Sequence, residues 1–152
     1  MTDPARDAAS LPGRTGSDYP APFDAPCAAR VRRALGDAFG LNDFGVNLLE
    51  LPPGSWSSQR HWHSHEDEFV YVLEGNPTLV TDAGRRRLAP GMVAGFPAGQ
   101  ADGHQLVNET DRPVRLLEVG GRKPAVDDTD YPDIDMRYDS AAGGYLRRDG
   151  TP

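Results

Sequence analysis

Cysteine and long apolar runs are both scarce in this sequence. The single cysteine, Cys27, excludes an intramolecular disulfide and suits a reducing compartment. No apolar stretch approaches the ~20 residues that a membrane-spanning helix needs, and the N-terminus has no hydrophobic signal region. These absences argue against both a disulfide-stabilised secreted domain and a membrane-spanning protein. We therefore expect a cytoplasmic protein.

Positive charge is also in short supply. The chain has 16 Lys and Arg residues against 23 Asp and Glu residues, which gives a formal net charge of -7. Nucleic acids and anionic membranes both require a basic face, so we expect neither as a partner. The basic run at residues 85–87 lies between a turn and an apolar segment, as expected of a solvated hairpin flank.

Several enzyme signatures are missing as well. The sequence contains no Ser-His-Asp arrangement, no phosphate-binding glycine loop and no dinucleotide-binding fingerprint. No general base stands out apart from the cluster of histidines and carboxylates described below.

Long helical patterns are absent, and short apolar segments separated by turn residues take their place. These segments lie between about residues 44 and 119 and are rich in β-branched and aromatic side chains. Closely spaced strands of this kind are typical of an all-β antiparallel sandwich or small barrel. We predict strands at residues 44–51, 59–63, 68–74, 78–82, 85–88, 92–96, 105–108 and 114–119.

The two ends of the chain differ from this central region. Residues 1–26 hold five prolines and two glycines with little apolar periodicity, which indicates a flexible N-terminal arm. Residues 27–120 form the predicted β domain, preceded by a short helix at residues 28–35. Residues 121–152 are rich in aspartate and are predicted to form an acidic tail packed on or near that domain.

The chemistry concentrates in residues 61–68, which hold three of the four histidines together with three carboxylates. Since residues i and i+2 of a strand share a face, His61 and His63 can point into one cavity. Glu68 heads a strongly apolar strand, where an unpaired buried carboxylate is costly. His104 begins another strand. A divalent cation held by these four side chains would compensate the carboxylate and use the imidazole lone pairs.

The spacing around these residues resembles a known family signature. Gly54, His61, His63, Glu68 and Gly75 follow one another in the order and nearly the spacing of the first signature of the cupins. Six residues rather than five separate Gly54 from His61, which is a small change in a loop.

The second cupin signature follows about fifteen residues later. It resembles the run formed by Gly91, Pro97, Gly99, His104 and Asn108. Two signatures in the right order are a specific match, and the resemblance covers most of residues 44–120. It implies a small antiparallel β-barrel or jelly roll, with irregular arms at both ends. It also implies the metal ligands His61, His63, Glu68 and His104.

Two positions leave the ligand set open. Four residues rather than two separate Gly99 from His104, and Asp102 occupies the position that strict spacing assigns to the ligand. We favour His104 because its offset to Asn108 matches the pattern. His65 would share the face of His61 and His63 if the strand continued, but residues 64–67 more closely fit a turn.

The resemblance allows two classes of function. The first is a metal-dependent enzyme that acts on a small polar metabolite, as a sugar or sugar-phosphate isomerase, a dioxygenase or a lyase. The second is a binding module that holds a small ligand, or only a stabilising metal, without turnover. One divalent Fe, Mn, Ni, Co or Zn ion is expected, because imidazole and carboxylate ligands suit all five metals. Resemblance to dimeric cupins also predicts a homodimer.

Overall fold

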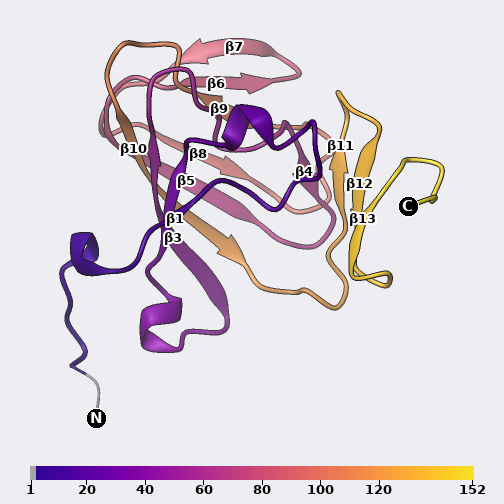
Figure 1. Ribbon diagram of the computed structural model, residues 1–152, viewed down its shortest axis with the longest axis horizontal. Helices are drawn as coiled ribbons and strands as arrows, with labels where there is room; N and C mark the ends of the chain where they lie inside the picture. The colour runs from indigo at the N-terminus through magenta and orange to yellow at the C-terminus, as the bar shows by residue number, and fades with distance from the viewer. Residues whose placement is uncertain (1–2) are drawn as a thin grey trace.

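Short antiparallel strands make up nearly all the regular structure in the computed structural model, which describes residues 3–152. Thirteen strands in this part of the chain form sheets of six, four and three strands (Figure 1). The helical elements of residues 3–152 are the 3-10 turns η1 (Ala8–Ser10), η2 (Ala25–Cys27) and η3 (Asp37–Phe39). The predicted all-β antiparallel class is confirmed. Within residues 3–152, no helix combines the length and apolarity needed to cross a membrane.

The six-stranded sheet carries most of the residues that were predicted as strands. Its order is β1-β2-β3-β10-β5-β8, and every pair of neighbours in it is antiparallel. The central strands β3 and β10 are eight residues each and pair over their whole length. The strands are β1 (Arg14–Thr15), β2 (Val31–Ala34), β3 (Phe44–Leu51), β10 (Val114–Gly121), β5 (Glu68–Glu74) and β8 (Val93–Phe96).

The core lies between this sheet and the three-stranded sheet of β7 (Gly84–Arg87), β6 (Thr78–Thr81) and β9 (Gln105–Val107). Alternation along β5 shows how the sequence builds it, because Val70 and Val72 are buried while their neighbours face outward. Each such side chain contributes roughly 1.5–3 kcal/mol by leaving water. The buried cluster consists of Leu49, Leu51, Val70, Val72, Leu88, Leu106, Val114 and Leu116.

Residues of the predicted acidic tail form the third sheet. Strands β11 (Thr129–Tyr131), β12 (Met136–Asp139) and β13 (Gly144–Leu146) join β4 (Trp62–His63) in the order β13-β12-β11-β4. Figure 1 shows these three strands standing at one end of the molecule, next to β4. Since Thr129 pairs with His63, the tail contacts the histidine-rich segment directly.

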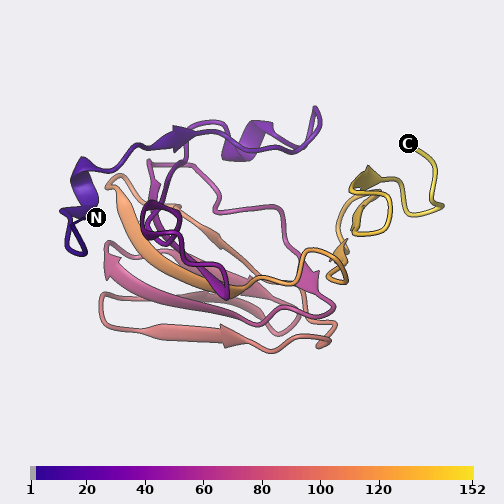
Figure 2. The same cartoon turned by 90° about the horizontal axis from the view of Figure 1, so that it is seen from below.

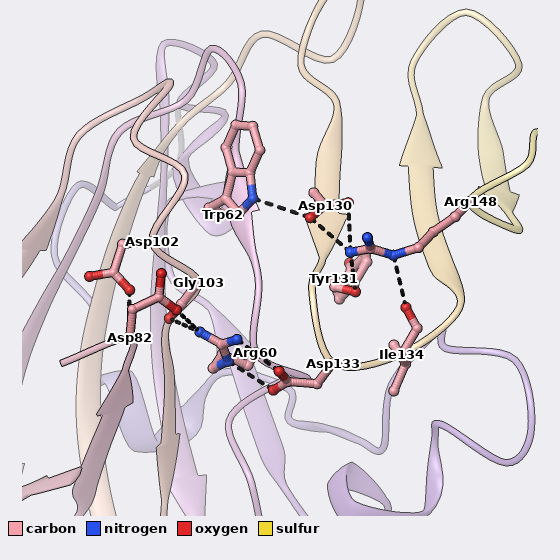
Figure 3. Close-up of polar contacts among 10 residues, drawn as sticks. All are labelled: Arg60, Trp62, Asp82, Asp102, Gly103, Asp130, Tyr131, Asp133, Ile134 and Arg148. Carbon is pink, nitrogen blue, oxygen red and sulfur yellow. Dashed lines mark hydrogen bonds and ion pairs between the residues drawn. The ribbon is translucent and has the colours of Figure 1, made fainter. Parts of the chain in front are cut away.

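A network of ion pairs anchors this third sheet (Figure 3). The guanidinium of Arg60 donates to both carboxylate oxygens of Asp133 at 2.7 and 2.8 Å, and to Asp82 at 2.5 Å. Asp102 accepts a hydrogen bond from the backbone N–H of Asp82 at 2.7 Å. Arg60 thereby joins the C-terminal sheet to the turn between β6 and β7.

The N-terminal segment runs along one side of the sheets, as the indigo ribbon of Figure 2 shows. Arg14 and Thr15 pair with Arg32 and Val31, so part of the predicted arm adds a strand to the six-stranded sheet. Further along, Gln59 Nε2 donates to the carbonyl oxygen of Phe23 at 2.8 Å.

The helix predicted at residues 28–35 is wrong. Residues 31–34 instead form β2, which pairs antiparallel with residues 47–50 of β3. A short alanine- and arginine-rich run has a weak preference for helix, and the ladder offered by β3 overrides it. Because side chains alternate along a strand, Arg32 and Arg33 point to opposite faces of the sheet.

The other predicted strands are confirmed within a few residues, with one exception. Residues 44–51 and 68–74 match β3 and β5 at both ends. The strand expected at 59–63 is shorter: only Trp62 and His63 form β4, while His61 makes an isolated bridge to His104. Periodicity did not reveal β11–β13, because their sequence is polar and interrupted by turns.

Replacing Arg60 with alanine tests the anchoring network. We expect Arg60→Ala to lower the free energy of unfolding by about 1–2 kcal/mol, since charge-assisted hydrogen bonds are lost but both aspartates stay half exposed to solvent. Urea denaturation measures this loss. Arg86→Ala is the control, because Arg86 is exposed on β7 and should change stability by less than about 0.5 kcal/mol. Equal effects of the two substitutions would contradict the anchoring role.

Candidate metal centre

The strand ends bring the four predicted ligands together. His61 and His104 face each other across an antiparallel bridge, with backbone hydrogen bonds of 3.1 and 2.8 Å. His63 follows in β4, and Glu68 is the first residue of β5. Three separate chain segments therefore meet around one carboxylate.

The distances among these side chains describe a single cluster. The Nε2 atoms of His61 and His104 lie 3.3 and 2.5 Å from Glu68 Oε2. His63 Nε2 lies 3.4 Å from Glu68 Oε1. His61, Glu68 and His104 form one candidate metal group, because each offers a ligand atom within 4.8 Å of the others. A second candidate group by the same criterion consists of His63, Glu66 and Asp127, and His63 adjoins the first group through Glu68.

The opposite nitrogens of two imidazoles are held by other groups. His61 Nδ1 lies 2.8 Å from the carbonyl oxygen of Gln59, and His63 Nδ1 lies 2.6 Å from Asp127 Oδ2. A carbonyl oxygen can only accept, so His61 donates from Nδ1. In the neutral ring this leaves the Nε2 lone pair directed at the cluster, which is how metal-binding histidines are oriented.

Asp127 is a site residue that the sequence analysis did not identify. Its side chain is buried, and its second oxygen accepts the backbone N–H groups of His65 and Glu66 at 2.8 and 3.0 Å. Asp127 comes from the acidic tail, more than sixty residues from His63. Nothing in the local sequence separates it from the other aspartates there, so only the tertiary contact reveals its role.

The cluster fits a divalent cation. Glu68 Oε2 is buried and has no hydrogen-bond partner within the described residues, although His104 Nε2 lies 2.5 Å away. Burial would raise the pKa of Glu68, but the three imidazoles outweigh it and hold this pKa well below its usual value. An ionised carboxylate and imidazole lone pairs repel one another, whereas a cation between them attracts all four groups.

Electrostatics around His63 lead to the same conclusion. Burial lowers the pKa of His63, but the carboxylates of Glu68 and Asp127 outweigh it and raise this pKa to about 9. The imidazole of His63 therefore lies between two negatively charged carboxylates. The same negative charge would stabilise a bound cation.

The two open alternatives occupy different places. Asp102 lines a cavity beside the cluster, but its carboxylate accepts the backbone N–H of Asp82 and it belongs to neither candidate metal group in residues 3–152. His65 is exposed, and its Nδ1 lies 2.8 Å from the hydroxyl of Ser64. Of these three residues, His104 is the one that forms a candidate metal group with His61 and Glu68 within residues 3–152.

Three cavities reach the cluster. One of about 180 Å³ is lined by Phe96, which stacks on His104 with ring centroids 3.6 Å apart. Two others, of about 240 and 320 Å³, lie on the interior side and share several lining residues. The shared residues are Arg32, Ser57, Ser58, His61, Glu68 and Glu118.

Glu118 is the second residue that the sequence analysis missed. It follows Val114 and Leu116 at alternate positions of β10, so it shares their inward face and lines both interior cavities. Burial, reinforced by the charge of Glu68, raises the pKa of Glu118 to about 7. A carboxylate at an inward position of an apolar strand was a detectable signal in the sequence.

Comparison with known proteins agrees with this arrangement. The family model described as "Cupin domain" matches residues 47–120. A search of curated protein sequences found no significant match.

Solved structures give a broader match. A sugar phosphate isomerase of the cupin superfamily from Silicibacter pomeroyi is 47% identical, with a TM-score of 0.91 over 98% of this chain and 96% of the other. A candidate sugar phosphate isomerase from Acidithiobacillus ferrooxidans is 37% identical, with a TM-score of 0.70 over 75% of this chain and 71% of that one.

A more distant structure shares the fold alone. The polyketide cyclase of Streptomyces resistomycificus is 21% identical, with a TM-score of 0.62 over 81% of each chain. The antiparallel sheets, the two matched signatures and the 47% identical relative lead to one conclusion: this chain belongs to the cupin superfamily.

Proposed function

We propose that this protein is a metal-dependent isomerase of a small sugar or sugar phosphate. The carrying observation is the group of His61, Glu68 and His104, with His63 3.4 Å from Glu68, beside an inward-facing carboxyl group, Glu118. The 47% identical relative, which is described as a sugar phosphate isomerase, supports the same class of reaction.

The ligand set suits catalysis. His61, His63, Glu68 and His104 would hold the cation, and a six-coordinate metal would keep positions for a substrate oxygen, whereas four ligands would close a tetrahedral zinc site. A bound divalent metal polarises such an oxygen and lowers the barrier to proton loss from the adjacent carbon.

Glu118 supplies the proton transfer that an isomerase needs. Isomerisation of a hydroxy-carbonyl compound moves a proton between neighbouring carbons, so one group must remove it and return it. A carboxyl group with a pKa of about 7 can do both at neutral pH. Its place in the same two cavities as His61 and Glu68 puts it within the volume that a small substrate would occupy.

Metal content tests the ligand set. We expect His61→Ala and Glu68→Ala each to remove most of the bound metal, measured by inductively coupled plasma mass spectrometry on protein purified without chelators. His65→Ala is the matched control and should retain the metal, because its imidazole lies outside both candidate groups in the described residues. Asp127→Asn should weaken the metal affinity about 10–100-fold by releasing His63. Unchanged metal content in both ligand variants would refute the metal centre.

Deuterium exchange tests the role of Glu118. In D₂O, an active isomerase incorporates solvent deuterium while it interconverts aldoses and ketoses, and NMR detects both events. We expect Glu118→Gln to lower kcat by about 10²–10⁴-fold while metal content stays unchanged. Glu74→Gln, on the exposed end of β5, is the control and should keep full activity. Full activity of Glu118→Gln would remove this residue from the mechanism, and a metal-loaded protein inactive on every sugar tested would favour a binding module.

We also propose that the protein forms a homodimer through the outer face of the six-stranded sheet. Phe69, Tyr71 and Leu73 alternate with the buried residues of β5 and are 39%, 39% and 44% exposed. Val93, paired with Tyr71 on the neighbouring strand, is 54% exposed. A contiguous apolar face of this kind is typical of a protein interface.

Light scattering tests this assembly. The wild-type protein should show about twice the mass of the 16.5 kDa chain. Tyr71→Glu should give the monomer mass, because a charge buried in an apolar interface is costly. Val126→Glu is the matched control, since Val126 is 50% exposed and lies outside the strands of this sheet, so its replacement should leave the dimer intact. A monomeric wild-type protein would refute the proposal.

A further inference from the structure

Two arginines without acidic partners line the cavity of about 240 Å³ beside the metal centre. Arg32 shares its face of β2 with Ala34, and both line the larger interior cavity. Its neighbour Arg33 faces the other way and pairs with Glu50 at 2.6 Å. Among the ion pairs of residues 3–152, none includes Arg30 or Arg32. In a chain of net charge -7, two such cations facing one cavity call for an anionic ligand.

Arg30 is held in place by the backbone. Its Nε donates to the carbonyl oxygen of Gly16 at 3.0 Å, and another of its nitrogens donates to the carbonyl oxygen of Ser57. These contacts orient the guanidinium but do not neutralise it, and they leave other N–H groups free. Arg32 makes no side-chain hydrogen bond within the described residues, so all the N–H groups of its guanidinium are free to donate to a ligand.

Hydroxyl groups line the same cavity as the two arginines. Ser17 Oγ is buried and lacks a hydrogen-bond partner within residues 3–152. Ser57 Oγ accepts the backbone N–H of Leu106 at 2.9 Å and lies 3.3 Å from Ser58 Oγ, so this pair of hydroxyls has one hydrogen left to donate to a ligand. Ser58 and Tyr19 line the same cavity. A buried hydroxyl without a partner costs stability unless a ligand satisfies it.

Three carboxylates share this cavity with the two arginines. Asp18 is engaged by both terminal nitrogens of Arg14, and the charges of Arg32 and Arg30 also help to lower its pKa. Glu68 belongs to the metal cluster, and the charges of Arg30 and Arg32 partly oppose the rise in the pKa of Glu118. Within residues 3–152 no ion pair joins these carboxylates to Arg30 or Arg32, so both guanidinium groups stay available to an anion.

We propose that Arg30 and Arg32, together with Ser17, Ser57 and Ser58, bind the phosphate group of a phosphorylated sugar whose reacting carbons lie at the metal centre. This inference rests on the proposed isomerase function and specifies its substrate class. Guanidinium groups bind phosphate through paired hydrogen bonds. A dianionic phosphate balances two arginines and offers three free oxygens to the hydroxyl donors, whereas a carboxylate offers one charge and two oxygens.

Isothermal titration calorimetry with inorganic phosphate tests the subsite on the purified protein with its metal content measured. We expect Arg32→Ala to weaken phosphate binding by roughly tenfold or more, the effect of losing a charge-assisted hydrogen bond. Arg32→Lys should have an intermediate effect, because lysine keeps the charge but not the fork. Arg86→Ala, with the same change of charge on exposed β7, should bind phosphate as the wild type does.

Three results would overturn the proposal: no phosphate binding by the wild-type protein, equal affinities of Arg32→Ala and Arg86→Ala, or acetate binding as tightly as phosphate. Circular dichroism checks that Arg32→Ala is folded. If Arg32→Ala is unfolded, the phosphate affinity of Arg32→Lys replaces it as the test.

Kinetics separates this proposal from the isomerase proposal. If both hold, Arg32→Ala raises KM for sugar phosphates at least tenfold, whereas Arg86→Ala leaves this KM unchanged. Turnover of sugar phosphates that is insensitive to Arg32 would refute the subsite and leave the isomerase standing. Phosphate binding that depends on Arg32, without isomerisation of any sugar phosphate, would refute the isomerase and leave an anion-binding site.

Discussion

The organisation of this protein depends on one buried carboxylate, that of Glu68, surrounded by three imidazoles. Glu68 heads a strand whose inward residues Val70 and Val72 belong to the apolar core, so its position follows from the packing of β5. An ionised group at that point is costly unless opposite charge compensates it. The histidines around it, and the cation that the four groups would hold, supply that compensation.

The C-terminal sheet and the segment before it hold the cluster of Glu68 and the three histidines in place. Asp127 holds His63 from outside, and strand β11 pairs with β4 directly beside it. Arg60 fastens the same sheet to the β6–β7 turn through Asp133 and Asp82. Groups that orient metal ligands tune both metal affinity and reactivity, so Asp127 gives the tail a part in the proposed metal centre. Arg30 and Arg32 line a cavity that also contains His61 and Glu68, and they form the proposed phosphate subsite.

Most strands of the six- and three-stranded sheets could be predicted from the sequence, because alternation of apolar and polar residues shows which face of a strand is buried. The four predicted ligands lie together for the same reason, since their order and spacing fit strand ends. The helix expected at residues 28–35 was wrong because pairing with β3 outweighed local propensity. Strands β11–β13 and the contact of Asp127 with His63 could not be predicted, because these polar segments show no alternation of apolar and polar residues. They form strands only where the tertiary structure brings them beside β4.

By itself the sequence determined the fold class, the family and the identity of the candidate metal ligands. Those properties depend on local periodicity and on residue spacing within single strands and turns. Only the tertiary structure decided that Asp127 supports His63, that Glu118 faces the metal centre and that Arg30 and Arg32 line the same cavity. Each of these contacts joins segments far apart in the chain. Their meeting depends on sheet register and packing, which no short stretch of sequence encodes.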